Sequence, residues 1–207
     1  MNQTLPTRSR LALLLGVLLT IAWPGVLYAE QPEQVPDVPA ASGFLLVASK
    51  QMADSRFRKT VILVSKHGNT GHVGVIVNRP LDVTLDRVFP ENPAAKNFTL
   101  FEGGPVLPKQ ISYLVRGSVF VKGALALSEN IYLAYDLPLL GELLNGKRDY
   151  KDLRVVHGMA TWAPKQLEYE IKLGDWYVVP LEDADIFDRP PAELWQELYR
   201  RATRIEV

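Results

Sequence analysis

Short apolar runs rich in β-branched residues, separated by turn residues, dominate the hydrophobic pattern from residue 43 onwards. Phe44–Ser49 reads FLLVAS, Thr60–Lys66 reads TVILVSK and Val73–Asn78 reads VGVIVN. Runs that are apolar on both faces predict strands covered on both sides. The glycine-rich segment His67–Gly71 predicts a tight hairpin, so the second and third runs are expected to be antiparallel neighbours.

Further β-rich runs follow along the chain, each bounded by polar residues, glycine or proline. Their Val, Ile, Leu and Tyr residues are typical of strands. These predicted strands are Asn97–Glu102, Gln110–Arg116, a stretch near Ser118–Leu127, Ile131–Tyr135, Leu153–His157 and Trp176–Pro180.

Helical spacing of apolar residues appears mainly in the second half of the chain. Leu137–Asn145, Pro164–Leu173 and Asp188–Ala202 place apolar residues three or four positions apart, which predicts amphipathic helices. Thr84–Phe89 predicts a short helix capped by its first residue, and Glu91–Lys96 a loop. Because strands and helices mix without a regular βαβ repeat, the fold class is predicted to be α+β.

Two corners are expected to organise the sheet. Asn78–Pro80 (NRP) ends a β-branched strand, and Glu102–Pro105 (EGGP) lies between two strands. Glycine permits positive φ and proline fixes its own φ, so both segments predict sharp turns. We expect the strands that carry these corners to form the middle of one sheet, which would place Arg79 beside Glu102.

A small polar site is one interpretation of this pair of corners. Arg79 and Glu102 would meet at a sheet end beside exposed glycine amides, and would form a pocket for an anion or a peptide terminus. The other interpretation is an arginine–glutamate pair that fastens two turns. Trp162, Gln166 and Trp176 either line the pocket or belong to the core. The candidate ligand-binding residues are Asn78, Arg79, Glu102, Gly103, Gly104, His157 and Trp162.

The composition excludes several kinds of chemistry. The 207 residues have a formal net charge of zero, so nucleic acid is not expected as a general partner. The absence of cysteine excludes disulfides, thiolate nucleophiles and cysteine-based metal sites. No metal site or cofactor is predicted, because His67 and His72 flank a hairpin without ligand spacing or a nearby acidic cluster. The glycine-rich loop between them leads into no helix, and no Gly-x-Ser-x-Gly motif is present.

The first 29 residues predict an export signal. Arg8 and Arg10 precede the apolar run Leu11–Ile21. Trp23–Gly25 then interrupts the helix, and Ala29 ends a candidate cleavage site.

The expected organisation is a signal peptide at 1–29, a proline-rich linker at 30–42 and a single domain at 43–207. The protein is then exported and periplasmic, with no membrane span after cleavage. An uncleaved N-terminal segment that anchors the protein is the alternative.

Several motifs occur in the order typical of one bacterial family. They are Gly43–Ser49 (GFLLVAS), Arg56–Val64, Gly74–Pro80 (GVIVNRP), Gly103–Val106 (GGPV), Trp162–Glu168 (WAPKQLE), Gly174–Trp176 (GDW) and Pro191–Trp195 (PAELW). Over Gly43–Arg201 the chain therefore resembles the YqgE/AlgH family. The resemblance implies a mixed, partly bifurcated β-sheet that curls into a pseudo-barrel with flanking helices. It implies no general biochemical activity, although the family name alludes to transcriptional regulation of alginate production.

Three hypotheses of function remain open. The first is a non-enzymatic binding or regulatory protein that is exported and acts through a protein or small-molecule partner. The second is a hydrolase-type enzyme with a polar site at Arg79 and Glu102, although no recognisable catalytic constellation is present. The third is a transcriptional regulator that contacts DNA directly, which would require a cytosolic pool.

Overall fold

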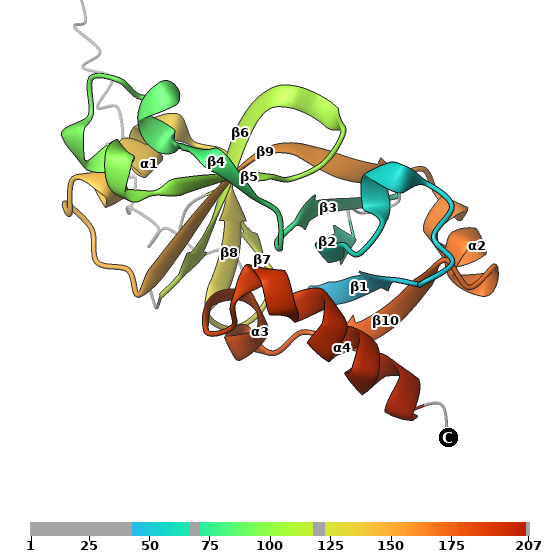
Figure 1. Ribbon diagram of the computed structural model, residues 1–207. Helices are drawn as coiled ribbons and strands as arrows, with labels where there is room; N and C mark the ends of the chain where they lie inside the picture. The colour runs from blue at the N-terminus through green and yellow to red at the C-terminus, as the bar shows by residue number, and fades with distance from the viewer. Residues whose placement is uncertain (1–42, 67–70, 118–122, 206–207) are drawn as a thin grey trace, which may run out of the picture. The chain divides into compact units, whose positions relative to one another are not determined.

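A long strand, β9 (Asp152–Trp162), is the central strand of the sheet (Figure 1). The computed structural model describes residues 43–66, 71–117 and 123–205. The other strands are β1 (Phe44–Ala48), β2 (Val61–Lys66), β3 (His72–Ile76), β4 (Pro80–Thr84), β5 (Thr99–Glu102), β6 (Val106–Arg116), β7 (Leu125–Ala126), β8 (Ile131–Ala134) and β10 (Trp176–Pro180). The α-helices are α1 (Leu137–Leu144), α2 (Gln166–Lys172), α3 (Asp183–Phe187) and α4 (Pro191–Ile205), and short 3-10 helices are η1 (Ser55–Phe57), η2 (Leu85–Arg87) and η3 (Pro93–Asn97).

The sheet divides at β9. Its main order is β10-β1-β2-β3-β9-β6-β8-β7, and β5 joins β9 as a branch that also carries β4. β3 pairs antiparallel with Ala160–Trp162, whereas β5 pairs parallel with Val155–His157. The sheet curls into a half-barrel flanked by helices, which confirms the predicted α+β class and the partly bifurcated sheet.

Buried apolar clusters hold the helices against the sheet. α4 packs Leu194, Leu198 and Ala202 into the largest cluster, and the Trp195 indole donates a hydrogen bond to the Ala48 carbonyl oxygen at 2.8 Å. α1 covers a second cluster and α2 a third. In the described ranges, no helix combines the length and the apolar character that a bilayer span requires.

The two predicted corners lie side by side. The Glu102 amide donates a hydrogen bond to the Arg79 carbonyl oxygen at 2.9 Å, and the Ile76 amide donates to the Gly103 carbonyl oxygen at 2.8 Å. β4, which begins at Pro80, pairs with β5, but β3, which precedes the first corner, does not, because β3 and β5 each pair with β9. The expectation that the strands carrying both corners form the middle of the sheet is therefore wrong for β5, which lies on the branch.

Among the predicted helices, α1 and α2 are confirmed within two residues, and the others need correction. Thr84–Phe89 contains only the 3-10 turn η2, and the expected loop at Glu91–Lys96 contains η3, which the Asn92 side chain caps by accepting from the Ala94 amide at 3.0 Å. The predicted helix Asp188–Ala202 begins only at Pro191, while the unpredicted α3 precedes it.

Most strand predictions are confirmed: β10 has the predicted bounds and β1, β5 and β8 match within two residues, whereas β6, β7 and β9 differ from the predicted bounds. β2 and β3 are antiparallel neighbours, as the glycine-rich segment predicted, although residues 67–70 lie outside the described residues. β9 continues past His157 because Gly158, at φ 72°, lets the strand bend and resume. Near Ser118–Leu127 only β7 is a strand in the described part, and residues 118–122 are not described.

Candidate functional site: an acidic pocket lined by aromatic rings

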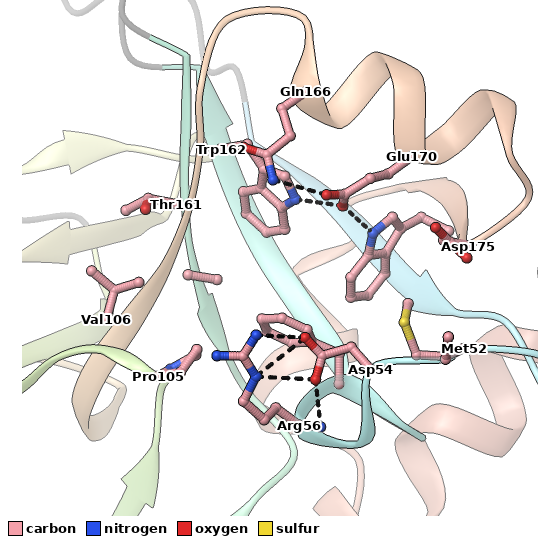
Figure 2. A pocket seen from close by; sticks show the side chains of 14 residues that line it. Met52, Asp54, Arg56, Pro105, Val106, Thr161, Trp162, Gln166, Glu170 and Asp175 are labelled. Atoms are coloured by element: carbon pink, nitrogen blue, oxygen red, sulfur yellow. Dashed lines mark hydrogen bonds and ion pairs between the residues drawn. The ribbon is translucent and has the colours of Figure 1, made fainter.

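A cavity of about 310 Å³ opens between η1, α2 and the sheet (Figure 2). Its walls come from the segment around η1, the corner before β6, the end of β9, the helix α2 and the start of β10. These parts are distant in sequence and meet only because β9 and β10 lie on the same sheet as β1 and β2. The volume lies at the lower end of the range of small-molecule sites.

The Glu170 carboxylate is held by side chains that themselves line the cavity. Its Oε2 accepts hydrogen bonds from the indole Nε1–H groups of Trp162 at 2.8 Å and Trp176 at 2.9 Å. Its Oε1 accepts a hydrogen bond from the Gln166 side-chain amide at 2.9 Å. Figure 2 shows hydrogen bonds converging on the Glu170 carboxylate, and the three donors hold it in one position.

Three aromatic rings stand together at the cavity. The rings of Trp162 and Trp176 meet edge to face with 6.2 Å between centroids, and Phe57 meets Trp176 in the same manner at 5.6 Å. The guanidinium of Arg56 lies 5.8 Å from the centroid of Phe57. A cation of the chain itself therefore already lies within cation–π distance of this aromatic group.

The opposite rim carries an ion pair. Asp54 accepts a hydrogen bond from the Arg56 amide at 2.9 Å and forms an ion pair with its guanidinium at 2.7 Å. Hydrogen bonding from the Arg56 side chain lowers the pKa of the Asp54 carboxyl below its usual value. Together with Glu170 and Asp175, the lining holds three carboxylates against one guanidinium, a net charge of −2.

The turn before α2 directs Gln166 and Glu170 towards the cavity. Lys165 adopts a left-handed conformation with φ 67° at the helix N-terminus, and the Gln166 Oε1 accepts a hydrogen bond from the Ala163 amide at 3.0 Å. This turn reverses the chain from β9 into α2. Gln166 and Glu170 are four residues apart and so lie on one side of the helix.

Arg79 and Glu102 meet as predicted but do not line the cavity. Their side chains form an ion pair at 3.4 Å. The Arg79 guanidinium also donates to the carbonyl oxygens of Arg56 at 2.6 Å and Arg58 at 3.1 Å. Arg79 therefore fastens the η1 segment to the corner, which favours the interpretation of this pair as a link between turns.

The remaining candidates are spread over the same corner. The Asn78 side chain bonds to backbone groups at the start of β2. Gly103 donates its amide to the His157 carbonyl oxygen at 2.7 Å, and Gly104 is buried. The Nδ1 atom of His157 lies 3.0 Å from the Pro108 carbonyl oxygen. Of the seven candidates, Trp162 lines the cavity, and Gln166 and Trp176 line it with Trp162.

Sequence reasoning missed the carboxylates of the cavity. Glu170 follows Gln166 by four residues and Trp162 by eight, and this spacing on a helix was the available signal. Asp54 carries no local signal, because only the pairing of distant strands brings it to the cavity, whereas Asp175 directly precedes Trp176 in the sequence. In the ranges 43–66, 71–117 and 123–205, no three His, Asp or Glu side chains are grouped as metal ligands, and His67 lies outside them.

The curled sheet, the β5 branch and the buried corner define the class of α+β half-barrel proteins with flanking helices. A family model described as AlgH-like matches residues 45–204, and the chain belongs to this AlgH-like family (DUF179). The resemblance to the YqgE/AlgH family inferred from the motifs is thereby confirmed.

Individual relatives support the same assignment. A UPF0301 protein of Streptomyces avermitilis is 34% identical over 172 residues, which cover 80% of this chain and 88% of the relative. A UPF0301 protein of Methylococcus capsulatus is 32% identical over 178 residues, which cover 83% of this chain and 97% of the relative. None of these names states an activity.

Two solved structures share the fold. The solution structure of AlgH from Pseudomonas aeruginosa matches with a TM-score of 0.66 and 25% identity, over 86% of this chain and 94% of that chain. A crystal structure of a Corynebacterium diphtheriae protein matches with a TM-score of 0.66 and 28% identity, over 78% of this chain and 86% of that chain.

Proposed function

We propose that the protein is a binding protein whose pocket takes an organic cation, a primary or quaternary ammonium group. The observation that carries this proposal is the Glu170 carboxylate, which two indole N–H groups hold beside three aromatic rings. Tryptophan faces attract cations most strongly among aromatic side chains. The net charge of −2 acts in the same direction, because a partly enclosed site screens charges less than open water does.

Binding is favoured over catalysis by the way Glu170 is held. These three hydrogen bonds orient the carboxylate as a fixed acceptor, and Oε1, which accepts only one of them, can still accept a hydrogen bond from an ammonium group. Arg79, the other residue considered for a hydrolase, donates to two backbone carbonyl oxygens and to Glu102. These contacts support a non-enzymatic role.

The proposed binding takes place outside the cytoplasm. Support comes from the charged start, the apolar run and the helix-breaking residues of 1–29. A small or polypeptide cation is then the proposed partner, and direct DNA binding is disfavoured because an acidic pocket repels phosphate.

A titration followed by tryptophan fluorescence tests the proposal. The full chain is titrated with n-butylammonium and tetramethylammonium, and separately with butyrate and n-butanol at matched ionic strength. Both cations are expected to bind with a dissociation constant near 1 mM, on the scale of about 1 kcal/mol per non-hydrogen atom. Equal responses to butyrate and n-butylammonium would contradict the proposal.

Two variants on one helix supply the matched comparison. Glu170→Gln keeps the size of the side chain but removes its charge, and should weaken cation binding about tenfold, the equivalent of about 1.4 kcal/mol. Glu168→Gln removes an exposed charge from the same helix, outside the cavity lining, and should leave the affinity within about twofold.

A further inference from the structure

On β6, an exposed apolar residue of the cavity lining is followed in sequence by a second exposed apolar residue. Val106 lines the cavity and is partly exposed, and the next residue, Leu107, exposes 58% of its surface. Leu107 also adopts φ 48°, a conformation that leucine rarely takes. Exposing an apolar side chain to water is unfavourable, and a binding partner that covers Leu107 would remove this cost.

A second apolar border lies on α2. Tyr169 and Leu173 expose 63% and 61% of their surfaces. Leu173 follows the cavity-lining Gln166 by seven residues, which is close to two helical turns, so the two lie on the same side of the helix. Tyr169 follows Gln166 by three residues and is its neighbour on the helix surface. A simple ammonium ion inside the cavity would not reach these side chains.

The edge of β9 is open beside the pocket. Ala160–Trp162, which line the cavity, pair with β3 along one edge. The pairing of β9 with β6 ends at Met159, opposite Val106. Among the described strands, none pairs with the other edge of Ala160–Trp162. An open strand edge offers main-chain donors and acceptors to an extended polypeptide.

From these features together we infer that the ligand is a lysine side chain on an extended polypeptide segment of a partner. This inference rests on the proposed function, since the lysine ammonium occupies the cation pocket beside Glu170. The main chain follows the open edge of β9, and apolar residues two positions before and after the lysine, which share its face of an extended segment, cover Leu107 and Leu173. The charge of the pocket is complementary to lysine, whereas the chain's own segment Glu30–Ser42 has three acidic and no basic residues and does not fit.

Short peptides test this inference against simple cation binding. The full chain is titrated with acetyl-Leu-Ala-Lys-Ala-Leu-amide, whose leucines lie on the lysine side of an extended chain, with the same peptide carrying glutamine in place of lysine, and with n-butylammonium. The lysine peptide should bind at least tenfold more tightly than either competitor. Equal affinity for the lysine peptide and n-butylammonium overturns the inference but leaves the proposed function standing. Absence of binding by both overturns the two together.

Border variants separate the polypeptide surface from the cation pocket. Asparagine is chosen at position 107 because it tolerates positive φ. Leu107→Asn and Leu173→Gln should each weaken the affinity for the lysine peptide about fivefold and leave the affinity for n-butylammonium unchanged. Leu137→Gln removes another exposed leucine side chain, from α1, and should change neither affinity. If both border variants bind the peptide as the wild type does, the polypeptide surface is refuted.

Discussion

At the scale of single residues, the corner before β6 depends on backbone contact between glycines. A Cβ atom on Gly103 would overlap the carbonyl oxygen of Gly158, and one on Gly104 would overlap the backbone of Met159. Gly104 also has φ 145°, which side chains other than hydrogen rarely allow. The corner therefore crosses β9 at a distance that only glycine permits, which explains the double glycine without a role in ligand binding.

Gly104→Ala is expected to lower the free energy of unfolding by at least about 2 kcal/mol, through steric overlap and backbone strain. Gly141→Ala is the matched control, because nothing lies within 4 Å of its added methyl group. In helix α1 it should be neutral or stabilising by up to about 1 kcal/mol. Urea unfolding measures both, and equal effects of the two variants would contradict the backbone contact.

A buried arginine links β6 to the segment before α4. The Arg116 guanidinium is almost fully buried and pairs with Asp152 and Asp188. Hydrogen bonding from Arg116 lowers the pKa of the Asp188 carboxyl below its usual value. A carboxyl group whose pKa is lower in the folded state than in the unfolded state stabilises the fold at pH values above its unfolded-state pKa. This stabilisation is lost as the pH falls through the folded-state pKa.

The Asp188→Asn variant should therefore show a weaker dependence of stability on pH. As the pH falls from 7 to 3 the wild type loses an increasing part of this carboxylate's contribution, whereas the variant has none to lose. Urea unfolding at several pH values in this window measures the difference. An unchanged slope in the variant would show that the Asp188 ion pair contributes nothing to acid sensitivity.

At the scale of elements, α2 is placed by the conformation of one exposed residue. Lys165 has φ 67° and makes no side-chain capping bond, yet it turns the chain so that Gln166 and Glu170 face the cavity. Left-handed backbone costs an ordinary residue about 1 kcal/mol, and a β-branched residue more.

Lys165→Gly is accordingly expected to raise the free energy of unfolding by up to about 1 kcal/mol, because glycine adopts positive φ without strain. The greater conformational entropy of glycine in the unfolded chain offsets part of this gain. Lys165→Val should lower it by about 1 to 2 kcal/mol, because a branched Cβ fits this conformation poorly. Thermal or urea unfolding decides between these signs. A valine variant as stable as the glycine variant would show that the turn carries no strain.

Local sequence patterns predicted those elements whose boundaries are set by nearby residues. The α1 helix and the hairpin of β2 and β3 follow from apolar spacing and glycine turns. The helix α3 was missed because it is only five residues long and depends on a capping box between Glu182 and Asp185. The extension of β9 was missed because Gly158 suggested the end of the strand. In the structure, β9 bends at Gly158 and continues to Trp162.

At the scale of the whole chain, the sheet determines which residues meet. The adjacency of Arg79 and Glu102 could be predicted, since both belong to corners next to β-rich runs. The pocket was predicted at Trp162, Gln166 and Trp176, and Glu170 and Asp175 from the same stretch of sequence could have been added. Its remaining residues, including Asp54, come together through the order of strands, which local patterns do not encode.

The proposed export makes a prediction for the mature chain. Protein isolated from a periplasmic fraction should begin at Glu30, after removal of the apolar segment and the proline and glycine that follow it. Intact-mass spectrometry or N-terminal sequencing measures this end. Recovery of the uncleaved chain from the membrane fraction would instead support the N-terminal anchor.

The cation pocket is tested most directly by the indole signals of ¹⁵N-labelled protein in an NMR titration with n-butylammonium. The Nε1–H groups of Trp162 and Trp176 both donate to Glu170, whereas that of Trp195 donates to the Ala48 carbonyl oxygen away from the cavity. We expect the first two signals to shift saturably, and the third to remain in place, when sodium chloride serves as the ionic-strength control. Indole signals of Trp162 and Trp176 that move no further than in sodium chloride would contradict a cation site at Glu170.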